Sequence, residues 1–300
     1  MNAKQSRLAF FALFAGATGI GFAPLFVRLS EVGPSMTAAY RVLLALPLLW
    51  TWLLLERRGK TPPPQPASPR DFAGLGIVGL FFVADLALWH WSLHMTSVAN
   101  STLLTNLAPL FVAVAAWRFL GERLTSLFLI GMALALVGAA MLVGRSLQFS
   151  QEHLRGDALS VFTALFYAGY LLSVKLLRRR WSVAVIMAWS GLVSGPCFAL
   201  IGWLSGEKLW PASAAGWGVL AGLALICHVA GQCLIGYGLG HLPASFSAVS
   251  LLWQPVVAAL TAWLFLREPL VLLQVAGGLV ILAGIALAGG LFRRPDKASV

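Results

Sequence analysis

Charged residues are scarce in this chain. Of its 300 residues, 21 are Lys or Arg and 10 are Asp or Glu, so that 10% are charged, whereas soluble globular domains carry about 25%. Hydrophobic residues make up 59%, and the mean hydropathy is +0.86. So few charges cannot cover a water-exposed surface. This excludes an ordinary soluble domain and indicates that most of the chain faces lipid or other helices.

Acidic residues are the scarcer of the two signs, and the formal net charge is +11. A basic chain could bind nucleic acid, but here Lys and Arg lie between long apolar runs and form no basic stripe with interleaved aromatic residues. We therefore expect no nucleic-acid partner. The positive charge is better explained by loops on the cytoplasmic side of a membrane.

Cysteine is rare, and catalytic motifs are absent. Cys197, Cys227 and Cys233 lie inside apolar runs and form no metal-type pair, so we interpret them as small buried side chains. The five histidines lack the spacing of metal ligands, and the sequence contains no H-E-x-x-H, G-x-S-x-G or P-loop motif. We expect no enzyme activity, no cofactor and no direct use of ATP.

Long apolar runs are what the sequence has instead. Ten segments come near the roughly 20 residues that a helix needs to cross a bilayer, and helices satisfy the backbone of such segments. The first run, Leu8 to Val27, is too long for a signal-peptide core. The ten expected spans are residues 8–28, 36–55, 72–94, 98–118, 124–144, 158–177, 182–204, 214–237, 243–266 and 270–292.

The distribution of Lys and Arg predicts the orientation. With the N-terminus in the cytoplasm, 15 of these residues lie on the inside and 6 lie at the outside. This predicts cytoplasmic termini, an external loop around Arg145–Asp157 and a multi-pass protein of the cell inner (plasma) membrane. The segment from Glu56 to Arg70 holds five prolines and is expected to be an irregular cytoplasmic loop.

The chain contains an internal repeat. With a shift of 146 residues, Pro109–Gly144 and Pro255–Gly290 align without a gap and are identical at 14 of 36 positions. A repeat of five helices is odd-numbered, so its second copy must enter the membrane upside down. Inverted repeats are typical of secondary transporters, whose substrate site lies at the repeat interface near the midplane. We therefore predict an all-α fold of two inverted repeats, residues 1–150 and 151–300.

Matched residues of the repeat suggest further roles. Pro109 and Pro255 are expected to break corresponding helices beside a central cavity, as gating elements, although a static kink for packing is equally compatible. Small residues seven apart, Gly131 with Gly138 and Gly277 with Gly284, predict close helix contact. We interpret Glu122 and Glu268 as caps of the helices that follow them, with a gating ion pair as the alternative.

Several motifs resemble a known family. The segments "WRFLGERLT" (117–125) and "WLFLREPLV" (263–271) resemble the helix 4/5 and 9/10 junctions of EamA-type transporters, in the drug/metabolite transporter superfamily. "HLPASFSAVSLLWQPVVAAL" (241–260) and "GDALSVFTALFYAGYLLSVK" (156–175) are similar to its eighth-to-ninth helix junction and sixth helix. The aromatic clusters further resemble YddG-type exporters of aromatic amino acids. The resemblance implies a carrier that works as a monomer or homodimer.

Polar and aromatic residues inside the spans are the candidates for a substrate site, because ionisable groups are costly there. Asp85 is the one acidic residue deep in a span, and it could carry a coupling proton. Interhelical hydrogen bonding is the alternative role for the polar candidates. The predicted cavity residues are Trp89, His90, Tyr167 and Trp253, with Tyr170 and Gln254 as polar contacts.

Arg41 has two interpretations. It could attract a substrate carboxylate, but we favour a side chain that reaches the interface or pairs with Glu31. The membrane core otherwise has almost no cations, which favours a neutral or zwitterionic substrate over a nucleotide sugar. A channel would usually need a ring of selectivity groups, which one central Asp cannot supply.

The expected function is export of aromatic and other neutral amino acids, or related small metabolites, by alternating access. We expect facilitated movement without obligatory proton coupling, since Asp85 and His90 diverge on their helix. The partners are then a small-molecule substrate and membrane lipid. The alternative is a broad-specificity drug or metabolite exporter that is proton-coupled through Asp85.

Overall fold

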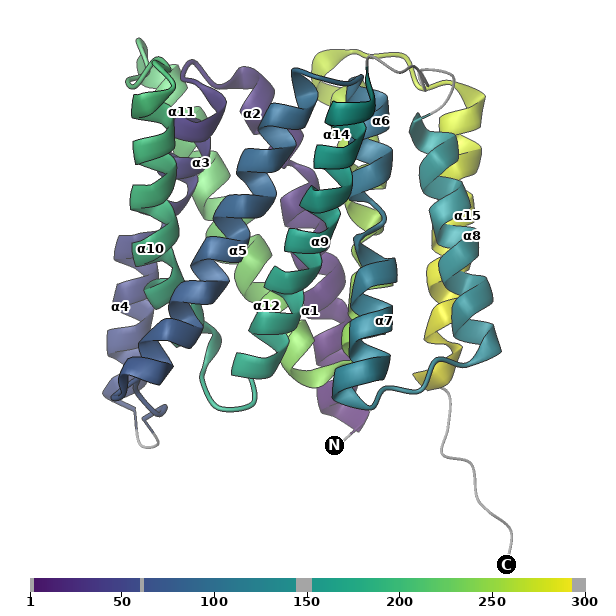
Figure 1. Ribbon diagram of the computed structural model, residues 1–300, viewed down its shortest axis with the longest axis horizontal. Coiled ribbons are helices and arrows are strands. Elements are labelled where there is room, and N and C mark those ends of the chain that lie inside the picture. The colour runs from purple at the N-terminus through teal and green to yellow at the C-terminus, as the bar shows by residue number, and fades with distance from the viewer. Residues whose placement is uncertain (1–2, 60–61, 144–152, 293–300) are drawn as a thin grey trace, which may run out of the picture.

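The computed structural model describes residues 3–59, 62–143 and 153–292 and is all-helical over those residues. The helices run side by side, with connections at two opposite ends of the bundle (Figure 1). Nine helical segments of the described part are long and apolar enough to cross a membrane, and a tenth, Leu272–Ala288, is apolar but shorter. The predicted all-α fold of ten helices is therefore confirmed.

The first half contains eight helices, because three of its spans are interrupted. The bounds are α1 (Ala3–Gly21), α2 (Ala23–Leu29), α3 (Pro34–Leu43), α4 (Leu46–Arg57), α5 (Pro69–Leu93), α6 (Val98–Thr105), α7 (Ala108–Leu120) and α8 (Ser126–Val143).

The second half continues with α9 (Leu154–Leu177), α10 (Val183–Leu204), α11 (Ala214–Gly222), the π-helix η3 (Leu223–Gln232), α12 (Cys233–His241), α13 (Ala244–Ser250), α14 (Trp253–Leu266), α15 (Leu272–Ala288) and the short 3-10 helix η4 (Gly289–Phe292). The predicted boundary between the halves, at residue 150, and most of the predicted external loop lie outside the described residues.

The two halves interleave. Helix α5 packs against α9, α3 against α10, α1 against α12 and η3, and α8 against α15. Each of these pairs joins one helix of the first half to one of the second. The surface between the halves therefore runs through the centre of the bundle and is available for a shared site.

Prolines stand at the starts of the interrupted helices. Pro109 follows a turn at 106–107 and Pro255 follows a turn at 251–252, at matching places in the repeat. Each helix axis is free to change direction there because proline lacks an N–H. Short-range hydrogen bonds continue through both turns. The N–H of Leu107 donates to the carbonyl of Leu104 at 3.1 Å, and the N–H of Leu252 donates to the carbonyl of Val249 at 3.1 Å.

Helices α8 and α15 touch through glycines. A Cβ added to Gly131 would lie 2.7 Å from the carbonyl oxygen of Gly284, and one added to Gly277 would lie 2.7 Å from that of Gly138. The backbones are thus too close for any side chain at these positions. The close contact expected from the spacing of the small residues is present.

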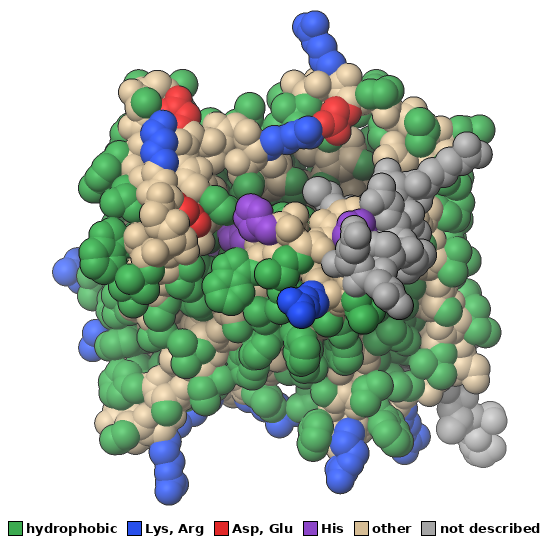
Figure 2. Space-filling model, turned by 45° about the horizontal axis from the view of Figure 1, so that its top comes forward, with side chains coloured by type: hydrophobic (Ala, Val, Ile, Leu, Met, Phe, Trp, Pro, Cys, Tyr) green, Lys and Arg blue, Asp and Glu red, His purple; other side chains and the backbone are tan. Residues whose placement is uncertain are grey.

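Large apolar side chains cover the outside of the bundle. In Figure 2, hydrophobic groups occupy most of the face that is shown. An apolar perimeter of this extent is expected of a surface that contacts lipid. Its exposed members include Phe11, Trp91, Phe119, Trp203, Leu204 and Leu272.

The contact between α8 and α15 yields a stability prediction. Gly277→Ala places a Cβ 2.7 Å from the Gly138 carbonyl and 2.9 Å from the Leu142 nitrogen, so the two helices must separate. Overpacking costs about 1–3 kcal/mol, and we expect the melting temperature in detergent to fall by roughly 2–10 °C.

Gly218→Ala is the matched control, because that helical glycine has open space at its Cβ. Its melting temperature should stay equal or rise, since Ala is the better helix former. Equal losses in both variants, measured by tryptophan fluorescence, would show that the α8–α15 contact tolerates a side chain.

Candidate functional site

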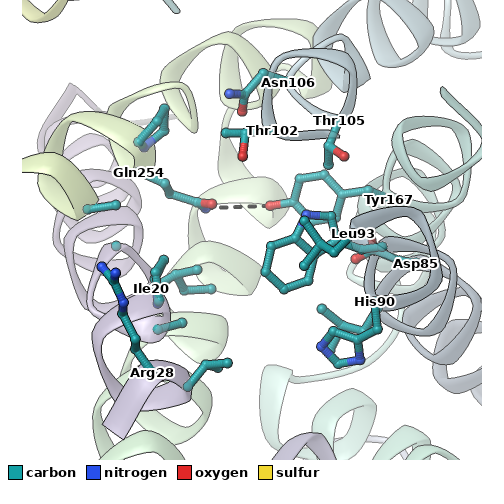
Figure 3. Close-up of a pocket in the computed structure, with 18 of the residues that line it drawn as sticks. Ile20, Arg28, Asp85, His90, Leu93, Thr102, Thr105, Asn106, Tyr167 and Gln254 are labelled. Atoms are coloured by element: carbon teal, nitrogen blue, oxygen red, sulfur yellow. Dashed lines mark hydrogen bonds between the residues drawn. The ribbon is translucent and has the colours of Figure 1, made fainter. Parts of the chain in front are cut away.

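A large cavity lies between the two halves of the bundle. Its volume is about 940 Å³, near the upper end of the roughly 300–1,000 Å³ of ligand pockets. Figure 3 shows side chains from both halves that point toward the same space. Its lining includes Arg28, Arg41, Phe82, Asp85, Trp89, His90, Thr102, Asn106, Tyr167, Gln232, Gln254, Pro255, Ala258 and Glu268.

The cavity reaches one end of the bundle, where an ion pair lies at its rim. Arg28 at the end of α2 and Glu268 between α14 and α15 pair there, and both side chains are largely exposed. Gln274 at the start of α15 also lines this end. In Figure 1 it is the end opposite the marked N-terminus.

The opposite end is held by other contacts. Both carboxylate oxygens of Glu122 accept backbone N–H groups at the start of α13, from Ala244 at 2.6 Å and Ser245 at 3.0 Å. Lys175 donates to the carbonyl of Leu242 at 2.6 Å, which ties α9 to the same connection. These bonds join helices of both halves beneath the cavity.

The two repeat-matched glutamates therefore differ in their contacts. The sequence predicted that each caps the helix that follows it, and Glu122 instead caps α13, which comes more than 120 residues later. Glu268 makes the ion pair that was the alternative interpretation, with Arg28. A carboxylate can stabilise any helix start that folding brings to it, and sequence neighbours have no priority.

Five of the predicted residues line the cavity wall together with Pro255. Trp89, His90 and Asp85 come from α5, while Tyr167 comes from α9 and Gln254 from α14. The Gln254 amide donates to the Tyr167 hydroxyl at 3.5 Å (Figure 3). The rings of Trp89 and His90 lie 5.3 Å apart, and Nδ1 of His90 is buried without a partner among the described residues.

Three predicted residues lie outside the lining. The Trp253 indole donates to the Thr18 hydroxyl at 2.9 Å and so ties α14 to α1. Tyr170 is buried behind Tyr167, with its ring parallel at 6.3 Å, and donates to the Gln232 amide oxygen at 3.3 Å. Pro109 is buried at the start of α7, away from the cavity lining. Tyr170 can thus affect the cavity through the lining residues that it contacts, Tyr167, Gln232 and Phe82.

Arg41 is the residue that sequence reasoning placed least well. Helix α3 begins at Pro34, so Arg41 lies two turns inside it, and its side chain is 7% exposed. Glu31 is not its partner: hydrogen bonds from the Ser213 hydroxyl and the Ala212 N–H hold the pKa of Glu31 below its ordinary value. A signal was present, since Ser35 and Thr37 make α3 too polar for a lipid-facing helix.

Two inverted five-helix halves around a shared central cavity define the fold of a secondary membrane transporter. The sequence profile of the EamA-like transporter family matches residues 7–144 and, a second time, residues 154–290. The chain therefore belongs to the EamA-like transporter family.

Individual relatives agree with this assignment. An uncharacterized transporter of Archaeoglobus fulgidus is 25% identical over 294 residues, which cover 96% of this chain and 98% of that protein. The pseudopaline exporter CntI of Pseudomonas aeruginosa is 24% identical over 279 residues, 92% of this chain and 95% of CntI. A protein of known crystal structure superposes with a TM-score of 0.78 at 19% identity, over 99% of this chain and 100% of its own, and shares the fold.

A third relative carries an amino acid in its name. The "Probable terminal-alkyne amino-acid exporter" of Streptantibioticus cattleyicolor is 29% identical over 204 residues, which cover 67% of each chain.

The access to the cavity gives a labelling prediction. In a chain whose cysteines are replaced (Cys197→Ala, Cys227→Ala and Cys233→Ala), Ala258→Cys should react with a membrane-impermeant thiol reagent in right-side-out vesicles, because Ala258 lines the open cavity. Ala67→Cys, exposed in the predicted cytoplasmic loop, should not. Reaction at Ala67→Cys alone would reverse the predicted orientation.

Proposed function

We propose that this transporter exports neutral, zwitterionic amino acids, with aromatic ones preferred, across the inner (plasma) membrane. The observation that carries the proposal is the cavity between the repeats, which combines aromatic walls with a few isolated polar and charged groups. Ligand sites generally have this composition, in which apolar area supplies affinity and a few polar groups fix orientation. The transport is by alternating access and uses no ATP.

The aromatic wall supports the preference for ring-bearing substrates. Phe82 and Trp89 on α5 and Tyr167 on α9 line the cavity from helices of both halves. Stacking contributes roughly 0.5–1.5 kcal/mol per ring pair beyond the buried area. One such contact gives up to about a tenfold preference, which favours Phe, Tyr or Trp without excluding Met or Leu.

The names of two relatives support the direction and the substrate class. One is a pseudopaline exporter and the other a terminal-alkyne amino-acid exporter, so export of small metabolites fits the family context. The balance of Lys and Arg supports an orientation in which the open end of the cavity faces outside. In this conformation a substrate would be released to the external medium.

Asp85 leaves an alternative mode of energy coupling. It lines the cavity and forms no hydrogen bond or ion pair with any residue that the structure describes, and Arg41 interacts with it electrostatically over a longer distance. A lone buried carboxylate can carry a proton. We favour facilitated movement, because α5 places Asp85 and His90 about 140° apart around its axis and no direct relay joins them.

Trp89→Ala tests the substrate preference. In proteoliposomes, the wild type should transport Phe, Tyr and Trp faster than Leu and much faster than Lys or Glu. The variant should lose up to about tenfold of the preference for Phe over Leu, while total neutral amino acid transport falls less. Trp91→Ala is the control, because that ring is exposed on the outside of the same helix.

Two results would contradict the proposal. Equal transport of charged and aromatic amino acids would remove the substrate class and leave a broad metabolite exporter. Accumulation of substrate against its gradient under an imposed pH gradient, lost in Asp85→Asn, would replace facilitated movement by proton coupling.

A further inference from the structure

The cavity contains a buried cation that forms no ion pair with the described residues. The Arg41 side chain lines the cavity and is 7% exposed, and its Nε and Nη2 atoms are fully buried with no hydrogen-bond partner in the part of the chain that the structure describes. No carboxylate of the described residues lies within ion-pair distance of it, and Asp85 interacts with it electrostatically only over a longer distance. Buried charges in proteins are normally paired or hydrogen-bonded, because their desolvation is costly. An unpaired guanidinium in this place therefore points to a partner outside the chain.

Other buried or half-buried cations of the bundle are satisfied by the chain itself. Arg178 donates to the carbonyls of Gly236 and Trp181, at 3.2 and 2.5 Å. Lys175 donates to the carbonyl of Leu242. The bundle can thus supply acceptors to cations, and the lack of one at Arg41 is particular to the cavity.

The surroundings hold the guanidinium in one place. Its Cζ lies 5.6 Å from the centre of the Phe82 ring, within cation–π range. Phe82, Asp85 and Trp89 follow one another on one face of α5, at spacings of three and four residues, and all three line the cavity. Arg41 is therefore placed against the same wall that carries an acid and the aromatic rings.

Asp85 is buried in the cavity and lacks an ion-pair partner among the described residues, as Arg41 does, but it is an acid. Its side chain is 6% exposed and makes no hydrogen bond or ion pair to the described residues. The other charged residues of the lining, Arg28 and Glu268, neutralise each other at the rim. Among its described residues, the interior of the cavity thus offers one cation and one acid that form no ion pair.

We propose that Arg41 binds the carboxylate of the transported molecule and that Asp85 binds its ammonium group. The apolar side chain of that molecule then lies against Trp89 and Tyr167. A planar guanidinium presents two parallel N–H donors to a carboxylate, which is the geometry of a strong, oriented pair. This inference rests on the proposed function, since it explains how a cavity with one cation and one acid selects a zwitterion.

The same charges exclude other substrate classes. A phosphate ester or nucleotide sugar carries two or more negative charges, and the single free cation could balance only one of them. A dicationic molecule would be repelled by Arg41 and would leave the guanidinium unpaired. A like charge in a site costs affinity as effectively as a missing contact, so the arrangement selects by repulsion as well as by attraction.

The test separates the two ends of the ligand. L-phenylalanine, 3-phenylpropionate, which lacks the ammonium group, and phenethylamine, which lacks the carboxylate, compete against labelled phenylalanine in proteoliposomes. Arg41→Gln should weaken phenylalanine and 3-phenylpropionate about tenfold or more and leave phenethylamine much less affected, because a hydrogen bond to a charged group is lost. Asp85→Asn should weaken phenylalanine and phenethylamine and spare 3-phenylpropionate.

Two further variants control for charge and folding. Arg41→Lys keeps the charge without the paired donors, and it should fall between the wild type and Arg41→Gln. Arg58→Gln removes one positive charge from the exposed end of α4 and should change the ranking of the three ligands in neither direction. Melting temperatures of all variants show whether the bundle is intact.

The outcomes are distinguishable. If phenylalanine is transported and Arg41→Gln weakens all three ligands equally, Arg41 serves only the fold and the inference fails while the proposed function stands. If the wild type transports no amino acid but binds 3-phenylpropionate through Arg41, the carboxylate site stands and the amino acid function fails. If no ligand responds to Arg41 or Asp85, both assignments of the charged groups are wrong.

Discussion

Hydrocarbon offers no hydrogen-bond partner to a peptide group, and this constraint shapes both the regular and the irregular parts of the bundle. The spans are helical because a helix satisfies its own backbone. The interruptions in four of them are tolerated because tight turns keep their N–H groups bonded, as at Leu107 and Leu252. Such breaks also let side chains such as Gln254 reach into a space that straight helices would close. At the break before α14, Leu251 and Leu252 are buried in protein, which keeps that irregular backbone away from lipid.

The sequence predicted the spans and the two-repeat fold well, since apolar length and matched residues are properties of composition and spacing. It did not predict the π-helix from Leu223 to Gln232, because a wider helical turn leaves the apolar run unchanged and depends on packing against α1. The candidate site was predicted in part. Trp89, His90 and Tyr167 line the cavity because each lies in an unbroken helix, α5 or α9, whose periodicity the sequence shows. Gln254 also lines it, although it follows the break at 251–252. The break at 251–252 stands between Trp253 and the polar stripe of α13, so continuous helical spacing misplaced its ring.

The positive charge of Arg41 in the cavity has no ion-pair partner among the described residues, because the acidic residues of the nearby loops bind elsewhere. Glu31 accepts hydrogen bonds at the start of α11, and Glu207 accepts two from the start of α3. Both acids are thereby committed to helix ends, where the dipole favours them. Arg41 lies two turns farther along α3, and no described residue accepts a hydrogen bond from its Nε or Nη2. A short-range pairing rule would have assigned Glu31 to Arg41, and only the three-dimensional contacts show that the acid is used elsewhere.

The glycine contact between α8 and α15 has a symmetry of its own. Gly131 meets Gly284, and Gly138 meets Gly277. Under the 146-residue shift, Gly131 corresponds to Gly277 and Gly138 to Gly284, so the two contacts are copies of each other across the pseudo-two-fold axis. This is the isologous arrangement of a C2 homodimer, in which one patch meets itself. Joining the halves at this seam therefore needs no residue that is particular to either half, and two separate copies of a single five-helix repeat, in opposite orientations, could form the same contact.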